Sequence, residues 1–294
     1  MGSIKPDVTI ASYATTYGFY ASVCGCRPLI LLCWGSDVLV DQNKSFLHRN
    51  AVTMAVRAAS LIVVDGLNMR SALLSMGVPK EHIIMFPWIN ERLFNEISAD
   101  RDLRMRLNWQ DKVVVVSVRM HEPVYAVETL IRAIPQVVSQ NRNVRFLIFG
   151  HGSLTAELVR LTNELGIDSF VHFAGLAPRQ NLLAYMKDCN IYVSTSLSDS
   201  TSSSLLEAMF LGLPVIVTSI LGNTEWITND VNGLMFEKQD SDALAKAIIR
   251  LVSNPAEAER LARSARRLVK ERVDWKRSSE ELIKRISSEA HVHR

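Results

Sequence analysis

Short apolar runs rich in β-branched residues alternate with amphipathic stretches along the whole chain, and this alternation constrains the fold most. The runs expected to form strands span 8–11, 29–33, 61–64, 82–86, 113–118, 145–149, 170–173, 191–194 and 214–218. The helical patterns between them span 124–138, 154–165, 179–187, 203–211, 241–252 and 255–273. Strands this apolar need cover on both faces, and helices that connect parallel strands supply it. The alternation therefore predicts an α/β fold with parallel sheets.

The 294 residues are enough for about two domains of ordinary size. A charge-rich segment over 98–111 separates four of the expected strands from at least five others. We therefore expect a first domain over 1–107 and a second domain that starts at residue 108. The first strand begins almost at once, which leaves no room for an earlier strand–helix unit, so we expect the first domain to be incomplete at its front.

Composition and charge exclude several classes of protein. Hydrophobic residues make up 48% and charged residues 21%, which supports full cores and excludes a mainly disordered chain. The net charge of +3 is too weak for a dedicated nucleic-acid binder, so we expect no nucleic-acid partner. No apolar run approaches the roughly 18 residues of a membrane span, and residues 1–7 carry no apolar signal region. We expect a cytoplasmic protein.

The four cysteines and seven histidines predict neither a disulfide framework nor a metal site. Cys24 and Cys26 are separated by one glycine, too close for an unstrained bridge, while Cys33 and Cys189 adjoin apolar runs. We interpret all four as reduced thiols, which agrees with a cytoplasmic location. No histidine falls at a spacing that suits zinc, so we expect no structural metal.

A strand, a hydroxyl-rich loop and an apolar helix follow one another over 191–211. Ser202, Ser203 and Ser204 give the start of this helix small side chains. The first backbone N–H groups of a helix and the positive end of its dipole attract anions, of which phosphate is the commonest. The segment therefore predicts an anion site, with an ordinary serine N-cap as an equal alternative on this feature alone.

Glu207 is an acid within the otherwise apolar stretch of 205–211. A carboxylate there costs several kcal/mol unless a partner satisfies it. It lies one to two turns from the expected anion site, about the distance from a diphosphate to the ribose of the same nucleotide. A pair of ribose hydroxyls would satisfy both carboxylate oxygens, and the alternative is an ion pair with a Lys or Arg that the sequence does not identify.

These features, together with motifs in matching order, resemble the retaining glycosyltransferases of family 4, also called glycosyl transferases group 1. The family's pair of acids has its counterpart in Asp199 and Glu207, which have seven residues between them and are followed by Ala-Met and by Gly212-Leu-Pro. Further motifs that match the family are Ser-Val-Arg119, Gly150-His-Gly152, Val171-His-Phe-Ala-Gly175, Gly222-Asn-Thr-Glu225 and Asn232-Gly-Leu. The resemblance covers the C-terminal half closely and the N-terminal half more loosely.

The resemblance implies a GT-B fold of two Rossmann-like domains that face each other across a cleft. Residues 1–107 would form the acceptor-side domain, 108–272 the nucleotide-sugar donor domain, and 273–294 a terminal helix that packs back toward the first domain. The implied reaction moves a sugar from a nucleoside-diphosphate sugar to the hydroxyl of a glycan or lipid-linked acceptor, with retention of configuration. It implies no metal and no other cofactor.

The resemblance also implies a role for each candidate residue. Arg119 and the backbone N–H groups of Ser202, Ser203 and Ser204 would hold the leaving diphosphate, Glu207 the ribose and Asp199 the sugar hydroxyls. Gly150 and Gly152 would form a tight turn beside the cleft, Gly175 and Leu176 would line the base, and Trp34 and Asp37 would lie on the acceptor side.

The chain also departs from the family pattern. The family's lysine after the arginine has no counterpart among residues 121–125, Asp199 is one methylene shorter than the usual Glu, and Trp34 stands where many relatives have a histidine. A nucleotide-sugar-binding module without turnover, or a subunit of an active transferase, is therefore the alternative. A nicotinamide dehydrogenase is disfavoured because Thr155 occupies the third glycine position.

Basic residues gather on the last part of the second domain. They suit a solvated helix face, but a lipid-linked acceptor would give them a role in peripheral contact with the inner membrane surface. These residues are Arg260, Arg263, Arg266, Arg267 and Lys270.

Overall fold

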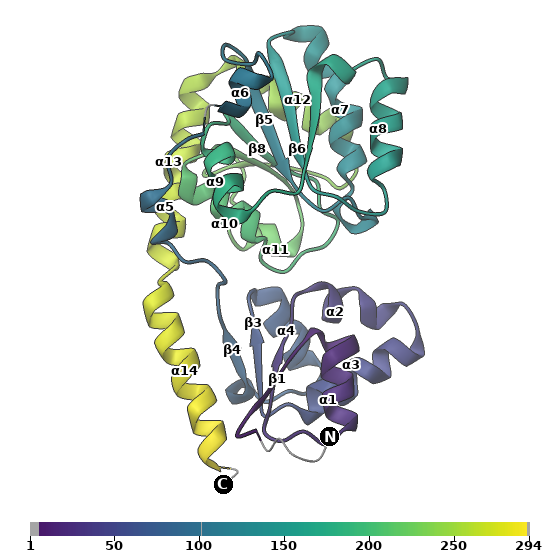
Figure 1. Ribbon diagram of the computed structural model, residues 1–294, viewed down its shortest axis with the longest axis vertical. Coiled ribbons are helices and arrows are strands. Elements are labelled where there is room, and N and C mark those ends of the chain that lie inside the picture. The colour runs from purple at the N-terminus through teal and green to yellow at the C-terminus, as the bar shows by residue number, and fades with distance from the viewer. Residues whose placement is uncertain (1–5, 101, 293–294) are drawn as a thin grey trace. The chain divides into compact units, whose positions relative to one another are not determined.

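The computed structural model describes residues 6–100 and 102–292. The chain divides into two compact units, which we describe separately (Figure 1). Unit 1 takes the described residues up to Trp88, the segment Ser198–Thr201 and the C-terminal segment from Asp274; unit 2 takes Ile89–Leu197 and Ser202–Val273. The division after Trp88 lies earlier than the boundary expected at residue 107, because Ile89, Phe94 and Ile97 pack into the core of unit 2.

Unit 1 contains a four-stranded parallel sheet in the order β1-β2-β3-β4. Its strands are β1 (Thr9–Ser12), β2 (Leu29–Leu32), β3 (Leu61–Val64) and β4 (Ile83–Met85). The helical segments of this unit are η1 (Tyr13–Gly18), α1 (Phe19–Val23), α2 (Ser36–Leu39), η2 (Asp41–Asn43), α3 (Phe46–Ala58), α4 (Leu67–Ser75), η3 (Lys80–His82) and α14 (Trp275–Val292). All four strands fall within a residue or two of the predicted runs.

Helices cover both faces of the unit 1 sheet. On one face, Leu31 and Ile62 pack with Val52 and Ala55 of α3. The alternate residues of the same strands point to the other face, where Ile30, Leu61 and Val63 pack with the side chains of Trp275, Leu282 and Ile286 from α14. The last helix of the chain therefore completes the core of the unit that contains the first strands (Figure 1).

Unit 2 contains a six-stranded parallel sheet in the order β10-β9-β8-β5-β6-β7. Its strands are β5 (Val113–Val118), β6 (Val144–Phe149), β7 (Val171–Gly175), β8 (Ile191–Ser194), β9 (Val215–Thr218) and β10 (Leu234–Phe236). Its helical segments are α5 (Leu93–Glu96), α6 (Asp102–Arg106), η4 (Pro123–Tyr125), α7 (Val127–Gln140), α8 (Thr155–Glu164), η5 (Asp168–Phe170), α9 (Arg179–Lys187), α10 (Ser203–Leu211), α11 (Leu221–Thr224), α12 (Ser241–Ser253) and α13 (Pro255–Arg272). The short strand β10 was not predicted. The strand order changes direction between β5 and β8.

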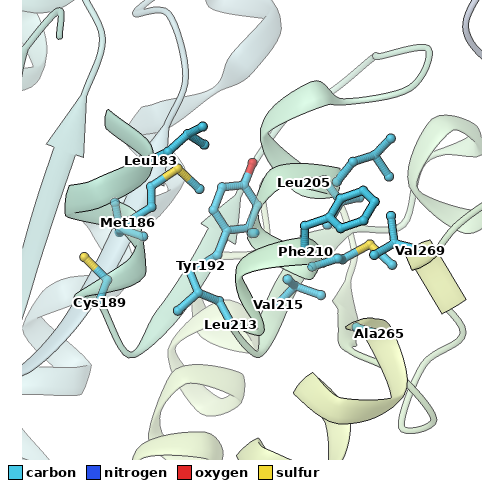
Figure 2. Packing of buried hydrophobic residues seen from close by; sticks show 14 of the residues in the cluster. Leu183, Met186, Cys189, Tyr192, Leu205, Phe210, Leu213, Val215, Ala265 and Val269 are labelled. Atoms are coloured by element: carbon cyan, nitrogen blue, oxygen red, sulfur yellow. The ribbon is translucent and has the colours of Figure 1, made fainter. Parts of the chain in front are cut away.

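Two hydrophobic clusters pack on the faces of the unit 2 sheet. Tyr192 of β8 lies at the centre of one cluster, fully buried, between Met186 of α9 and Leu205 of α10 (Figure 2). Val269 of α13 packs against the same cluster. The α/β class with parallel sheets, expected from the alternation of strands and helices, is confirmed in both units.

Two further expectations concern the whole chain. The cysteines are free thiols, as expected. None of the helices in the described part of the chain is both long and apolar enough to cross a membrane.

Candidate functional site

Arg119 lies at the carboxyl edge of the unit 2 sheet, directly after β5. Its Nε donates a hydrogen bond to Ser194 Oγ at the end of β8 (3.0 Å), and its Nη2 donates to Ser202 Oγ. Its guanidinium carbon lies 5.4 Å from the centre of the Tyr125 ring, within cation–π range. These contacts fix the side chain between β5 and β8, where the strand order reverses and where α/β sheets bind their ligands.

The N-terminus of α10 meets Arg119 at this point. Ser202 is the N-cap, since its Oγ accepts a hydrogen bond from the backbone N–H of Leu205 (3.2 Å). Ser204 is buried and its Oγ lies 2.8 Å from the hydroxyl of Tyr192, whereas Ser203 is exposed. The first N–H groups of a helix have no acceptor within the helix, and its dipole is positive there. The guanidinium of Arg119 lies beside this positive end of α10, and a bound anion stabilises both.

Glu207 lies one turn further along α10, with a buried side chain. Burial raises the pKa of its carboxyl group, and the charge and hydrogen bond of Arg179, together with the charge of Arg119, oppose that rise. Glu207 Oε1 lies 2.9 Å from Arg179 Nη2, and the Arg179 side chain is 50% exposed. An ion pair was the alternative that the sequence left open, and Arg179 is its cation. The assignment of Glu207 to a ribose stays a prediction.

Sequence reasoning missed Arg179. It is the first residue of α9, after Pro178, and its contact with Glu207 joins two different helices. The signal that could have found it is its place in the chain. It follows the carboxyl end of β7, at the same sheet edge as Arg119.

A hollow of about 250 Å³ opens at the same edge of unit 2. Its lining residues include Arg119, Tyr125, Gly150, Gly175 and Leu176. Gly150 has a φ of +130°, and a Cβ there would lie 1.9 Å from the Arg119 carbonyl oxygen. Only glycine fits such a close approach of two loops. The hollow thus unites the predicted arginine with two predicted glycines and Leu176.

The loop after Gly150 is fastened to the loop after Arg119. A Cβ at Gly152 would lie 2.5 Å from the carbonyl oxygen of His121, and Glu122 Oε1 accepts a hydrogen bond from the backbone N–H of Ser153 (2.9 Å). That bond and a second one from the Ser153 hydroxyl hold the pKa of Glu122 below its usual range. The tight turn predicted for Gly150 and Gly152 therefore packs against the segment that presents Arg119.

His121 is a further residue of this segment that the sequence did not single out. It is buried, with Nδ1 2.9 Å from Thr155 Oγ1, while Nε2 has no hydrogen-bond partner among the described residues. Burial is the main cause that lowers the pKa of its imidazole. We interpret His121 as a packing residue beneath the loop.

A larger hollow, about 420 Å³, lies at the opposite, amino-terminal edge of the unit 2 sheet. Asn190, Pro214 and Arg266 are among its lining residues, next to the starts of β8 and β9 and to α13. Ligands of α/β sheets bind at the carboxyl ends of the strands. We therefore assign the candidate site to the edge that carries Arg119.

Asp199 belongs to the segment Ser198–Thr201 of unit 1, whereas Arg119 and Glu207 belong to unit 2. Its carbonyl oxygen accepts a hydrogen bond from Asn68 Nδ2 (2.8 Å). Asp65 directly follows β3 and was not predicted. Burial is the main cause that raises the pKa of Asp65 to about 6, and the charge of Asp199 adds to that rise. The contact of Asp199 with sugar hydroxyls stays a prediction.

Trp34 and Asp37, the predicted acceptor-side residues, follow β2 at the carboxyl edge of the unit 1 sheet. Asp37 is fully buried, and its carboxylate accepts hydrogen bonds from the backbone N–H groups of Ala14 (2.9 Å) and Trp34 (3.1 Å). It therefore holds the backbone of this edge in place and does not present its carboxylate to solvent. Trp34 is exposed.

Within residues 6–100 and 102–292, no three His, Cys, Asp or Glu side chains gather as a metal site would require. A cation fixed beside a helix N-terminus at the reversal point of a doubly wound sheet is typical of α/β domains that bind phosphorylated ligands. The fold and the site therefore define a protein of this class.

The chain belongs to the family of glycosyl transferases group 1, whose family model matches residues 100–268, more than half of the chain. A second model, described as glycosyl transferase 4-like, matches residues 1–66. The chain is 29% identical over 157 residues to an uncharacterized glycosyltransferase of Methanocaldococcus jannaschii, covering 53% of this chain and 40% of that protein. It is 25% identical over 179 residues to the poly(ribitol-phosphate) alpha-N-acetylglucosaminyltransferase of Staphylococcus aureus, covering 60% and 35%. The chain thus spans about half the length of these curated relatives or less.

Solved structures show the same fold. HepE of Anabaena, solved with UDP and glucose, has a TM-score of 0.83 at 23% identity, covering 96% of this chain and 78% of that one. Sucrose-phosphate synthase from Thermosynechococcus elongatus has a TM-score of 0.79 at 22% identity, covering 96% and 73%. The GT-B fold class, with two parallel-sheet α/β domains, is confirmed by these likenesses.

Proposed function

We propose that the protein is a retaining glycosyltransferase that moves a sugar from a nucleoside-diphosphate sugar to an acceptor hydroxyl. One observation carries the proposal: Ser194 and Ser202 hold Arg119 against the N-terminus of α10, beside the hollow that contains Gly150 and Gly175. A diphosphate is a group that satisfies a guanidinium and a helix N-terminus at once.

The proposed chemistry needs charge stabilisation on the leaving group. As the bond between the sugar C1 and the phosphate oxygen breaks, negative charge grows on the diphosphate, where Arg119 and the N–H groups of Ser203 and Ser204 would stabilise it. The acceptor oxygen would form its bond to C1 on the same face, and the departing phosphate oxygen would take the acceptor proton. Asp199 would orient the sugar hydroxyls, and the protein would otherwise contribute positioning.

Glu207 would accept hydrogen bonds from the ribose hydroxyls, and Arg179 supports that role. An ionised carboxylate is an acceptor only, whereas a protonated one also carries a donor. Because Arg179 opposes the effect of burial on the pKa of Glu207, it favours the ionised form that two donating hydroxyls require. Arg179 is thus proposed as a positioning residue rather than a catalytic one.

The comparisons support the choice of substrates. HepE was solved with UDP-glucose, and the relatives include enzymes named for transfer to poly(ribitol-phosphate) and to phosphatidylinositol mannosides. We therefore take UDP-glucose as the first donor to test, and a glycan or a lipid-linked glycan as the acceptor class. No metal enters the proposed steps, so excess EDTA should leave turnover unchanged.

The proposal is tested by incubating the protein with nucleotide sugars and measuring release of the nucleoside diphosphate, with and without candidate acceptors. Proton NMR of the product then gives the configuration at C1, which should be that of the donor. Arg119→Ala should lower the activity at least tenfold, about 1.4 kcal/mol, while Arg49→Ala, which removes an exposed arginine of α3, should keep it. Donor turnover that Arg119→Ala leaves unchanged, or an inverted product, would contradict the proposal.

One observation favours a second candidate, a nucleotide-sugar-binding module without turnover. Tyr125, whose ring lies beside the Arg119 guanidinium, ends the short segment 122–125 in which the family pattern has its lysine. The diphosphate would then have one fewer cation to stabilise its developing charge. Calorimetric titration with UDP-glucose and GDP-mannose, followed by a donor hydrolysis assay, separates the two. Binding without hydrolysis or transfer to any acceptor favours the module.

We further propose that the protein works in the cytoplasm, because its free thiols suit a reducing compartment. Peripheral membrane contact through the basic residues of α13 would serve a lipid-linked acceptor. Co-sedimentation with vesicles containing anionic lipid tests this contact, and absence of binding at low salt would exclude it.

A further inference from the structure

Trp34 is a large apolar side chain that the fold of unit 1 leaves in solvent. It follows Cys33 at the end of β2, at the carboxyl edge of the parallel sheet. The residue is 41% exposed, although Cys33 before it and Gly35 after it are buried. Tryptophan is usually largely buried, and an exposed tryptophan ring at the ligand-binding edge of a sheet is a feature that packing does not explain.

The ring is nonetheless held in one orientation. Its Nε1 donates a hydrogen bond to Ser12 Oγ (2.6 Å) at the end of β1, and its backbone N–H donates to the buried carboxylate of Asp37 (3.1 Å). Trp88 packs on the ring with centroids 5.1 Å apart and planes tilted by 33°. A ring held by its Nε1 hydrogen bond and by the Trp88 ring loses little further freedom when a ligand binds to it.

Other aromatic rings support the pair from behind. Phe86 packs edge-on against Trp88, with centroids 4.6 Å apart, and edge-on against Trp275, with centroids 5.1 Å apart. The four rings therefore form a continuous row of aromatic contacts that runs from α14 to the carboxyl edge of the sheet. Trp34 is its exposed end.

Hydroxyl groups flank this end of the row. Tyr13, next in the chain to Ser12, has a φ of +72°, a conformation that is unusual and strained for a residue with a side chain. Its hydroxyl donates to Asp41 Oδ2 (2.9 Å) and lies 2.9 Å from the hydroxyl of Ser36, two residues after Trp34. The ends of β1 and β2 thus carry fixed hydroxyl groups, of which that of Ser12 contacts the Trp34 ring at Nε1.

We propose that Trp34 is a stacking platform for a saccharide ring, so that the acceptor of this protein is a carbohydrate that docks on unit 1. A pyranose has a face of C–H groups, which carry partial positive charge, and the face of an aromatic ring is negative. The hydroxyls around the edge of the pyranose can exchange hydrogen bonds with neighbouring serine and tyrosine hydroxyls. The inference rests on the proposed function only where it calls this saccharide the acceptor.

Fluorine NMR tests the platform without any need for turnover. The chain has five tryptophans, and 5-fluorotryptophan labelling gives each its own signal, with Trp34→Phe assigning that of Trp34. The labelled protein is titrated with maltotriose, cellotriose and chitotriose at millimolar concentrations, and separately with uridine and choline. At least one trisaccharide should shift the Trp34 and Trp88 signals, while those of Trp109 and Trp226 in unit 2 stay unchanged.

The variants then measure how much the ring contributes. Trp34→Ala should weaken saccharide binding, followed on the Trp88 signal, at least about tenfold, whereas Trp34→Phe should keep most of it because it preserves an aromatic face. Tyr20→Ala, which removes an exposed ring from α1, is the matched control and should bind normally. An unshifted Trp275 signal in the free Trp34 variants shows that unit 1 is still folded, whereas the Trp88 signal moves because its ring contacts the substituted residue.

The outcomes separate the platform from the donor site. If no trisaccharide shifts the Trp34 signal, or if only uridine or choline does, the inference is overturned. If Trp34→Ala binds as well as the unaltered protein, it is equally overturned. Calorimetric titration of UDP-glucose into the unaltered protein reports on the donor site. Absence of UDP-glucose binding together with a saccharide shift of the Trp34 signal counts against the proposed transfer alone.

Discussion

Replacing Arg179 by alanine removes the cation that faces Glu207 and leaves a carboxyl group buried on α10. Burial already raises the pKa of Glu207 from its ordinary value of 4.5, and the charge and hydrogen bond of Arg179 limit that rise. In Arg179→Ala the pKa of Glu207 should therefore rise further. The carboxyl group should then be protonated over a wider range of pH, and ionising it should destabilise the folded state more.

The sign of the pH effect follows from the raised pKa. A folded protein that binds a proton more tightly than the unfolded chain is most stable below the unfolded pKa, and it loses that advantage as the pH rises through the folded pKa. Because the variant has the higher folded pKa, its free energy of unfolding should fall over a wider range above pH 4.5. The variant should therefore be close to the unaltered protein at pH 5 and clearly less stable at pH 8.

The size of the effect follows from the geometry of the pair. Removing one partner of a buried ion pair costs about 3–5 kcal/mol. Arg179 is half exposed and its charge is screened by water, so we expect roughly 1–2 kcal/mol at pH 8. Urea unfolding at pH 5 and pH 8, followed by tryptophan fluorescence, measures the difference.

A matched double variant isolates the carboxyl group. Arg179→Ala combined with Glu207→Gln has no acid to titrate, so its stability relative to Glu207→Gln alone should not depend on pH. If Arg179→Ala loses the same free energy at pH 5 and pH 8, or if the double variant keeps the pH dependence, the described coupling between the two side chains is refuted.

Three other changes test separate parts of unit 2. Arg119→Ala should lower kcat/KM at least tenfold, about 1.4 kcal/mol, and unchanged kinetics would remove Arg119 from the diphosphate site. Gly150→Ala places a Cβ 1.9 Å from the Arg119 carbonyl oxygen, so it should destabilise unit 2 by about 1–3 kcal/mol and weaken donor binding. Thermal unfolding measures the stability and calorimetry the donor binding, and a variant with normal stability and donor binding would refute the close approach. Tyr192→Phe removes the hydroxyl that lies 2.8 Å from Ser204 Oγ, so urea unfolding should show a loss of about 1 kcal/mol, while no loss would mean that the bond contributes nothing.

The parts of the site that follow local rules were predictable from the sequence. The bounds of α10 agree with the prediction because Ser202 caps its start and Gly212, with a φ of +80°, ends it. The bounds of α9 also agree, and Arg119 falls at the expected strand end. Such signals depend on neighbours in the chain and need no knowledge of the packing.

The parts that depend on contacts between distant segments were not predictable. The ion pair of Glu207 joins α10 to Arg179 of α9, and the burial of Asp37 arises because its carboxylate binds the backbone of two other segments. The short strand β10 has three residues and follows an Asn-Gly turn, too little for a periodic pattern. The position of Ile89 in the core of unit 2 likewise depends on tertiary packing. The charge-rich segment over 98–111 therefore led us to expect a boundary at residue 107, later than the division after Trp88.

The attachment of α14 to unit 1 has a consequence for how the chain folds during synthesis. The ribosome makes β1–β4 before α14, so the apolar side chains of Ile30, Leu61 and Val63 lack their contacts with α14 until that helix is made. Domains generally fold in the order of their synthesis. Here unit 2 can fold before unit 1 is complete, so the nascent chain exposes this apolar face of the unit 1 sheet until α14 has been made.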